Sequence, residues 1–321
     1  MSEPGSQHVE SSTAAETIQA IVDNLALVIH APEETLRLCV LCLVSEGHLI
    51  LEDFPGVGKT MLAKALARSL DVSFSRMQFT PDLLPSDVTG VNVFNQRSNE
   101  FEFKPGPVFA NLLLVDEINR ASPKTQAALL ECMQEQQVTV DGFSYELTRP
   151  FMVMATQNPI EYEGTYPLPE AQLDRFTMRI AIGYPPLAQE AKMLTEQTGD
   201  PPLEQLEPAA SAADALSLAD EAKEIYVEES LNRYVVALLR ATRGDSRLYL
   251  GASPRAGIAL LRVAKARALA AARSFLEPDD VKAVAVPVLA HRLILAPEAR
   301  SSGLTGERIV QETLEKTPVP V

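Results

Sequence analysis

The chain has 321 residues, 46% of them hydrophobic and 22% charged, which is the balance of a globular protein with room for two compact domains. The formal net charge of -15 argues against nucleic acid as the main partner, because affinity for nucleic acid comes mostly from clustered Lys and Arg. No apolar run is long enough to span a bilayer, and the N-terminus lacks the basic and then apolar order of a secretory signal. We therefore expect a cytoplasmic protein without an integral membrane segment.

The first elements predicted along the chain are two helices. Residues 1–12 are rich in Ser and Glu and are expected to form a disordered tail. Apolar residues then recur at helical spacing from 13 to 29 and from 32 to 45. The second helix contains Cys39 and Cys42 in the apolar run LRLCVLCLV, where positions i and i+3 share a helix face, and this favours core packing over a redox role.

An α/β domain is predicted over residues 13–183. The short apolar runs HLILED, RMQF, NLLLVDE, FMVMATQ and TMRIAI alternate with longer helical patterns, which is typical of a buried parallel sheet flanked by helices. Two stretches inside this domain, 90–109 and 137–150, alternate like hairpins, the second around Asp141-Gly142. The aromatic residues Phe94, Phe101 and Phe103 of the first stretch either contact a partner or close a small local core.

A smaller all-α domain is predicted after Gly183. Residues 184–210 are interpreted as a linker helix, opened by YPPLAQEAKML, and a proline-rich connector. Residues 211–296 are rich in Ala and Leu at helical spacing and predict a lid of helices. Residues 297–321, which end in EKTPVPV, are expected to be a C-terminal tail.

The strongest chemical signal is the loop DFPGVGKT between the first strand and the next helix. A strand, a glycine-containing loop and a helix N-terminus together form a cradle for phosphate groups. Lys59 would reach the β and γ phosphates of ATP, and Thr60 would offer its hydroxyl to Mg²⁺. Asp53 stands where the usual pattern has its first glycine. The residues predicted to contact the nucleotide are Asp53, Pro55, Gly56, Val57, Gly58, Lys59, Thr60 and Met61.

Two later strands deliver polar residues to the same edge of the sheet. NLLLVDE ends in Asp116, a candidate Mg²⁺ ligand, and Glu117, a candidate general base for attack of water on the γ-phosphate. FMVMATQNP ends in Asn158, which is suited to orient that water. Taken alone, an acid pair also favours the first turn of a helix, and an Asn before Pro also favours a turn.

The motif order DFPGVGKT, LLLVDEINRA, ATQNP, LPEAQLDRF and GASPRA resembles the MoxR family of AAA+ ATPases, and FTPDLLPSDVTG adds to the likeness. The resemblance runs from about residue 13 to about residue 295. It implies that Asn158 is sensor 1, that Arg175 is the arginine finger and that Arg255 is sensor 2. It also implies that the stretch 90–109 is the helix-2 insert and that the stretch 137–150 is the pre-sensor-1 hairpin of the helix-2-insert clade.

The resemblance further implies a function and partners. They are Mg²⁺-dependent ATP hydrolysis in a homo-hexamer, chaperone-like maturation of a client that can include metal insertion, and a von Willebrand A domain protein as partner. Three other functions stay open: a magnesium-chelatase-like subunit, a nucleic-acid motor and a non-hydrolysing nucleotide switch. Acidic composition disfavours the motor, and the presence of Glu117, Asn158 and Arg175 disfavours the switch.

Overall fold

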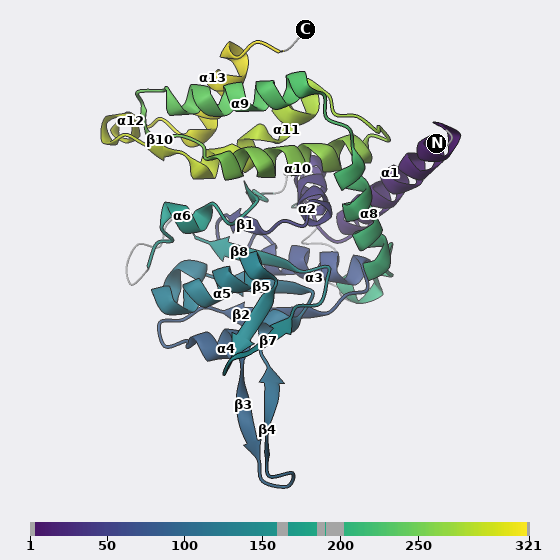
Figure 1. The fold of residues 1–321 in the computed structure, drawn as a ribbon, viewed down its shortest axis with the longest axis vertical. Helices are drawn as coiled ribbons and strands as arrows, with labels where there is room; N and C mark the ends of the chain where they lie inside the picture. Colours follow the sequence, from purple (N-terminus) through teal and green to yellow (C-terminus); the bar gives the residue numbers. More distant parts are fainter. Residues whose placement is uncertain (1–3, 159–165, 185–189, 191–201, 320–321) are drawn as a thin grey trace.

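The computed structural model describes residues 4–158, 166–184, 190 and 202–319. Figure 1 shows a helical layer at the top, an α/β layer in the middle, and a β-hairpin that projects from the lower end. An α/β core followed by a helical lid is the predicted fold class, and the prediction is confirmed.

The α/β layer is built on one five-stranded parallel sheet in the order β2-β5-β8-β1-β9. The five runs predicted as strands are its five members. Their bounds are Leu49–Glu52 for β1, Phe74–Gln78 for β2, Leu112–Asp116 for β5, Met152–Gln157 for β8 and Met178–Ile180 for β9.

The strands of the sheet are buried on both sides because helices cover both of its faces. In β5, Leu112 and Leu114 belong to one core cluster, whereas Leu113 and Val115 belong to the other. The first cluster includes residues of α1 (Pro4–Ala26), α2 (Glu33–Val44) and α3 (Lys59–Ser69). The second includes residues of α4 (Pro85–Thr89) and α5 (Pro123–Glu135). This alternation follows from the two-residue period of a strand.

The first helix begins within residues 1–12, which were predicted to form a disordered tail. Helix α1 already begins at Pro4 and continues through to Ala26. Its later part is anchored, since Ile18, Ile21 and Leu25 are fully buried. Once the later part of α1 is fixed, each further residue toward the N-terminus adds a helical hydrogen bond without a new nucleation cost. The Ser and Glu content of residues 1–12 does not reveal this extension of the helix.

The cysteine pair in α2 is structural. Cys39 and Cys42 are free thiols with no exposed surface, and burial raises the pKa of Cys39 to about 12. A thiol in such surroundings is inert, so the interpretation as core residues is confirmed.

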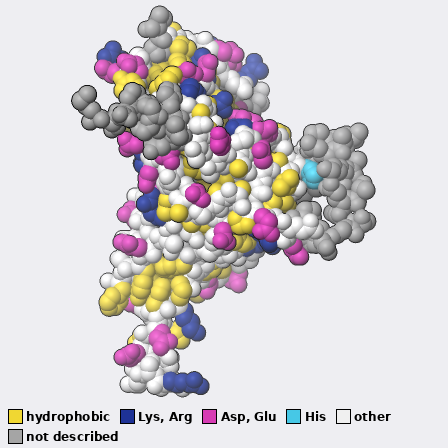
Figure 2. Space-filling view, turned by 90° about the vertical axis from the view of Figure 1, so that its right-hand side faces the viewer, with side chains coloured by type: hydrophobic (Ala, Val, Ile, Leu, Met, Phe, Trp, Pro, Cys, Tyr) yellow, Lys and Arg dark blue, Asp and Glu magenta, His cyan; other side chains and the backbone are white. Residues whose placement is uncertain are grey.

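Both predicted hairpins are present. Strand β3 (Gly90–Asn95) pairs with β4 (Glu100–Pro105), and β6 (Gln137–Val140) pairs with β7 (Phe143–Glu146). Phe103 stacks on Tyr145 with ring centroids 4.1 Å apart, so it joins the two hairpins. Phe94 and Phe101 contact each other but stay 46% and 71% exposed. One aromatic residue therefore closes a local core, and the other two form a surface. Figure 2 shows apolar side chains gathered at the end of the α/β layer from which the β3–β4 hairpin projects.

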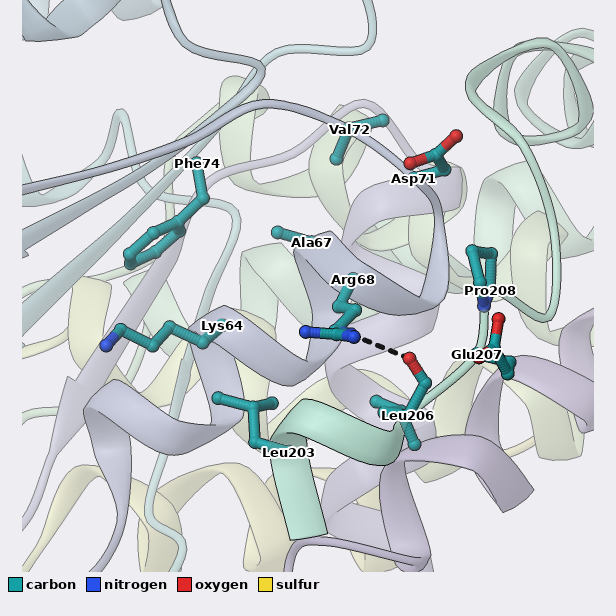
Figure 3. A pocket seen from close by; sticks show the side chains of 10 residues that line it. All are labelled: Lys64, Ala67, Arg68, Asp71, Val72, Phe74, Leu203, Leu206, Glu207 and Pro208. Carbon is teal, nitrogen blue, oxygen red and sulfur yellow. Dashed lines mark hydrogen bonds between the residues drawn. The ribbon is translucent and has the colours of Figure 1, made fainter. Parts of the chain in front are cut away.

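The connector to the lid lies against α3. The helix expected to begin at Tyr184 lies almost wholly outside the described residues. Beyond it, the side chain of Arg68 donates hydrogen bonds to the carbonyl oxygens of Leu206 at 2.7 Å and Glu204 at 2.6 Å. Figure 3 shows the hydrogen bond from Arg68 to Leu206, beside a cavity of about 510 Å³ between α3 and the connector. The connector is thus fixed to the helix that follows the glycine loop.

The lid is helical with one short pair of strands. Its helices are α8 (Ala212–Glu224), α9 (Glu229–Arg243), α10 (Pro254–Ala270), α11 (Pro278–Leu289), α12 (Pro297–Ser301) and α13 (Gly306–Lys316). Strand β10 (Leu248–Leu250) pairs with β11 (Ile294–Leu295). The buried residues of the lid belong to the same core cluster as those of α1 and α2, so apolar packing is continuous between the two layers.

Two helices, α12 and α13, lie within residues 297–321, which were predicted to form a C-terminal tail. Helix α13 buries Ile309, Val310 and Thr313, which recur at helical spacing. The prediction rested on the prolines of EKTPVPV, and these follow the helix instead of interrupting it. Within the described part of the chain, no helix is long and apolar enough to cross a membrane.

Candidate functional site

The glycine loop follows β1 directly and ends at the first turn of α3. Gly56 and Gly58 have φ angles of +87° and +93°, a conformation that residues with a Cβ atom rarely adopt. Gly58 is the N-cap of α3, which begins at Lys59. The backbone therefore turns so that the positive end of the helix dipole faces the space beyond the sheet edge, which is the arrangement that binds phosphate.

Asp53, at the first position of the loop, has a structural task that a glycine could not perform. Its carboxylate is 5% exposed and accepts hydrogen bonds from the backbone N–H groups of Phe54 at 2.9 Å and Gly183 at 2.7 Å. Gly183 lies just beyond β9. The side chain thus joins the start of the loop to the end of the neighbouring strand.

Lys59 is bent back onto the loop. Its Nζ donates to the carbonyl oxygen of Asp53 at 2.6 Å. Burial lowers the pKa of Lys59, and the nearby charges of Asp53, Asp116 and Glu117 oppose that shift. Because three carboxylates surround it, this ammonium group lies in the most acidic part of the site.

Asp116 ends β5 and is 8% exposed. One carboxylate oxygen accepts a hydrogen bond from the hydroxyl of Thr156 at 3.2 Å. The other pairs with Nε of Arg76 at 2.7 Å. A cationic group therefore already faces the carboxylate at the position where a metal ligand was predicted.

Glu117 has a left-handed backbone, with φ 56° and ψ 53°. Its backbone N–H donates to the hydroxyl of Thr156 at 2.9 Å, so Thr156 holds both members of the acid pair. Its side chain pairs with Nη1 of Arg120 at 2.8 Å. Non-glycine residues in this region carry strain and are common in functional sites.

These residues surround one cavity of about 430 Å³ at the C-terminal edge of the sheet. The predicted site residues that line it are Pro55, Gly56, Gly58, Lys59, Thr60, Met61, Asp116, Glu117 and Asn158. Of the other predicted residues, Asp53 holds the loop from behind, and Val57 packs against the core. Three parts of the chain that are far apart in the sequence thus line one cavity.

Three lining residues were not among the predicted site residues: Arg76, Gln78 and Thr156. Arg76 and Gln78 lie at the C-terminal end of β2, which pairs with β5 so that Gln78 is opposite Asp116. The signal was present, because RMQF places polar residues at the end of a strand just as NLLLVDE and FMVMATQ do.

The two predicted arginines lie outside this lining. Arg175 is half-buried between α6 (Glu170–Leu173) and β9, and its side chain makes no hydrogen bond or ion pair with the described part of the chain. Arg255 is exposed in the first turn of α10. One copy of the chain therefore does not bring either guanidinium to the cavity wall.

The donor groups fit a hard cation held together with phosphates. Thr60 and Asp116 line the same cavity and offer a hydroxyl and a carboxylate. Mg²⁺ in nucleotide sites is bound by one or two such oxygen ligands plus phosphates and water. The described residues contain no group of three or more His, Cys, Asp or Glu that would hold a metal ion by themselves.

The chain is similar to known proteins along almost its full length. Residues 48–178 match the ATPase family associated with various cellular activities (AAA), and residues 240–313 match the AAA lid domain. The chain is 48% identical to the Bacillus subtilis protein YeaC, with 94% of each chain covered. It is 39% identical to "Chaperone MoxR1" of Mycobacterium tuberculosis, with 95% of this chain and 82% of that protein covered.

Two further likenesses agree with these. The chain is 31% identical to "Protein MoxR" of Methylorubrum extorquens, with 92% and 93% of the two chains covered. The crystal structure of a proposed ATPase from Cytophaga hutchinsonii matches the fold with a TM-score of 0.92 at 40% identity, covering 99% of both chains. The predicted resemblance is confirmed: this chain belongs to the MoxR family of AAA+ ATPases.

Proposed function

We propose that the protein binds ATP with Mg²⁺ in the cavity at the sheet edge, hydrolyses it in a ring, and uses the cycle to remodel a partner protein. The observation that carries the proposal is the convergence of Lys59, Asp116, Glu117 and Asn158 on one cavity beside a left-handed glycine loop. A cation, a metal-binding acid, a second acid and a water-orienting amide are the groups that phosphoryl transfer to water requires.

Five of the lining residues have a proposed task in binding or hydrolysing ATP. The N–H groups at the start of α3 and the ammonium group of Lys59 bind the phosphates, for which Lys59 leaves the carbonyl oxygen of Asp53. Thr60 and Asp116 hold Mg²⁺, which when bound neutralises charge on the phosphate oxygens. Glu117 accepts the proton of the attacking water, and Asn158 orients that water.

The side chain of Glu117 is engaged by another residue in this structure. Its carboxylate is paired with Arg120 at 2.8 Å, so one of its oxygens is engaged and not directed at an attacking water. Phosphate binding beside Glu117 changes the local charge, so we propose that ATP favours release of Glu117 from Arg120.

The remaining cation comes from a second subunit. A planar guanidinium stabilises the charge of the transition state, and the side chain of Arg175 makes no hydrogen bond or ion pair with the described residues of its own chain. We propose that Arg175 reaches the cavity of the neighbouring subunit in a homo-hexamer, and that Arg255 senses the nucleotide from the first turn of α10. The AAA lid match over 240–313 supports a mobile role for the part that carries Arg255.

We propose that ATP hydrolysis by this protein drives chaperone-like remodelling of a partner protein. One relative is named a chaperone, and the exposed pair Phe94 and Phe101 offers an apolar surface of the kind that contacts other proteins. Maturation of a partner complex, with metal insertion as one form, and a von Willebrand A domain protein as helper are proposed from the family resemblance. A cytoplasmic location is proposed with it, since the three cysteines are free thiols.

The test is ATP turnover measured against protein concentration for the wild type, Glu117→Gln, Arg175→Ala, and an equal mixture of the two variants. We expect turnover per subunit to rise with concentration, each variant to be inactive, and the mixture to recover about a quarter of the wild-type rate, because one interface in four then combines an intact base with an intact finger. Concentration-independent turnover in the wild type, together with a fully active Arg175→Ala, would refute assembly-dependent hydrolysis.

A further inference from the structure

The segment that carries Arg175 is held by a side chain of the lid. Arg292 lies in the 3-10 turn Ala290–Arg292 after α11, and its Nε donates to the carboxylate of Asp174 at 2.7 Å. Its guanidinium also donates to three backbone carbonyl oxygens of the same segment, those of Asp174 at 3.3 Å, Phe176 at 2.7 Å and Thr177 at 3.2 Å. Residues on both sides of Arg175 are therefore fixed by one guanidinium.

This contact is built into the interior. The side chain of Arg292 is 3% exposed, and a guanidinium is buried at such a site only when its donors are satisfied. A fifth acceptor, the carbonyl oxygen of Val288, completes the set from α11. Neighbouring His291 adds a second lid contact to the segment, because its Nε2 is 3.2 Å from the carbonyl oxygen of Phe176.

The same segment is joined to the start of α10. The hydroxyl of Ser253, the N-cap of α10, lies 3.2 Å from the second carboxylate oxygen of Asp174 and donates to it. Arg255 stands two residues further along, in the first turn of the helix. Asp174 is thus a shared acceptor for the helix that carries Arg255 and for the turn that carries Arg292.

We propose that Arg292 and Asp174 position Arg175 for the neighbouring subunit and make that position follow the lid. A movement of α10 in response to the nucleotide of its own subunit would pull on Asp174 through Ser253, and Arg292 would carry the backbone of Arg175 with it. The state of one site then sets how well the finger reaches the next site. This inference rests on the proposed function of Arg175.

If Arg292 only stabilised the fold, its contacts with residues 174–177 would not be needed to hold this segment in place. The segment is already anchored to the α/β layer, since Phe176 is fully buried and the backbone N–H of Thr177 donates to the carbonyl oxygen of His48 at 2.8 Å. Arg292 adds contacts from the lid to a segment that the sheet already holds. Two sets of contacts from two layers are what a part that transmits movement between them requires.

The test uses Arg292→Lys, which keeps a buried positive charge but cannot form the same forked contacts. The matched control is Arg273→Lys, because Arg273 also donates to a buried aspartate of the lid, Asp280 at 2.6 Å, and does not contact the finger segment. Each variant is assayed for ATP turnover alone and in equal mixtures with Glu117→Gln and with Arg175→Ala, and melting temperatures check that each is folded.

If Arg292→Lys misplaces only the finger, its turnover falls at least about tenfold with little change in KM for ATP. The mixture with Glu117→Gln, which supplies an intact finger, then recovers, whereas the mixture with Arg175→Ala does not. Recovery with Arg175→Ala would show that the defect lies in the variant's own site and would overturn the inference. Turnover equal to that of Arg273→Lys would also overturn it.

A second readout does not depend on turnover. In the Glu117→Gln background, ATP is expected to change the hydrogen exchange of peptides that cover residues 173–178, and the added Arg292→Lys change is expected to abolish this response. An unchanged response would overturn the coupling to the lid. If the mixture of Glu117→Gln with Arg175→Ala fails to recover, the proposed function itself fails. If that mixture recovers and Arg292→Lys behaves like its control, the inference alone fails.

Discussion

Replacing Asp53 by glycine, the residue that usually opens a phosphate-binding loop, is expected to destabilise this protein. The carboxylate of Asp53 accepts two backbone hydrogen bonds, from Phe54 at 2.9 Å and from Gly183 at 2.7 Å, and is 5% exposed. A hydrogen bond to a charged group contributes about 1.5–3 kcal/mol, and the cost of burying the carboxylate offsets part of the sum. We therefore expect Asp53→Gly to lower the free energy of unfolding by about 2–4 kcal/mol.

The measurement is urea denaturation followed by far-ultraviolet circular dichroism, because the chain contains no tryptophan. Asp53→Asn, which retains one acceptor oxygen, should lose roughly half as much stability as Asp53→Gly. Asp71→Gly is the control, since Asp71 is exposed with a φ of 48°, where glycine is at no disadvantage. If Asp53→Gly unfolds within about 0.5 kcal/mol of the wild type, Asp53 does not hold the loop as described.

Three further predictions follow from side chains around the cavity and the sheet. Arg76→Met removes the cation that pairs with Asp116. Because the side chain of Arg76 is 52% exposed, this ion pair is worth about 1 kcal/mol, and the Mg²⁺ concentration for half-maximal ATP turnover should fall about fivefold. An unchanged Mg²⁺ requirement would contradict competition between Arg76 and Mg²⁺ for Asp116. Thr156→Val keeps the side-chain shape but removes the hydroxyl that holds Asp116 and Glu117, so kcat should fall by about tenfold or more while ATP still binds, as isothermal titration would show. Burial lowers the pKa of His48 to about 4, and its unfolded value is near 6.5, so the unfolded chain binds more protons at this residue between these values. His48 alone should therefore lower the free energy of unfolding by about 2 kcal/mol from pH 7 to pH 5. Urea titrations at the two pH values measure this loss, and a His48→Gln variant that loses just as much would assign it to other groups.

Local patterns were sufficient to predict the strands, the hairpins and most of the cavity wall. A strand has a two-residue period whatever surrounds it, and an Asp-Gly pair forms a hairpin turn by its own backbone preference, as at Asp141 and Gly142 with φ angles of 51° and 85°. Lys59, Asp116, Glu117 and Asn158 each follow a predicted strand, and parallel strands end at one edge. Their convergence needed no long-range information.

Features that depend on packing between distant segments were not predicted. Arg76 reaches Asp116 only because β2 is the strand next to β5, and the order of strands in a sheet is not encoded in any one strand. The contacts of Arg292 with residues 174–177 join parts of the chain more than a hundred positions apart. Helix α13 was missed because the prolines that follow it were given more weight than the spacing of Ile309 and Val310.

The most direct test of the account is to measure ATP binding and ATP hydrolysis side by side for the wild type, Lys59→Ala and Glu117→Gln. Hydrolysis by the wild type, loss of nucleotide binding in Lys59→Ala, and binding without hydrolysis in Glu117→Gln are the predicted results, because one residue binds phosphate and the other accepts the proton. Hydrolysis by Glu117→Gln at the wild-type rate would contradict the account, since the proton acceptor would then be another group.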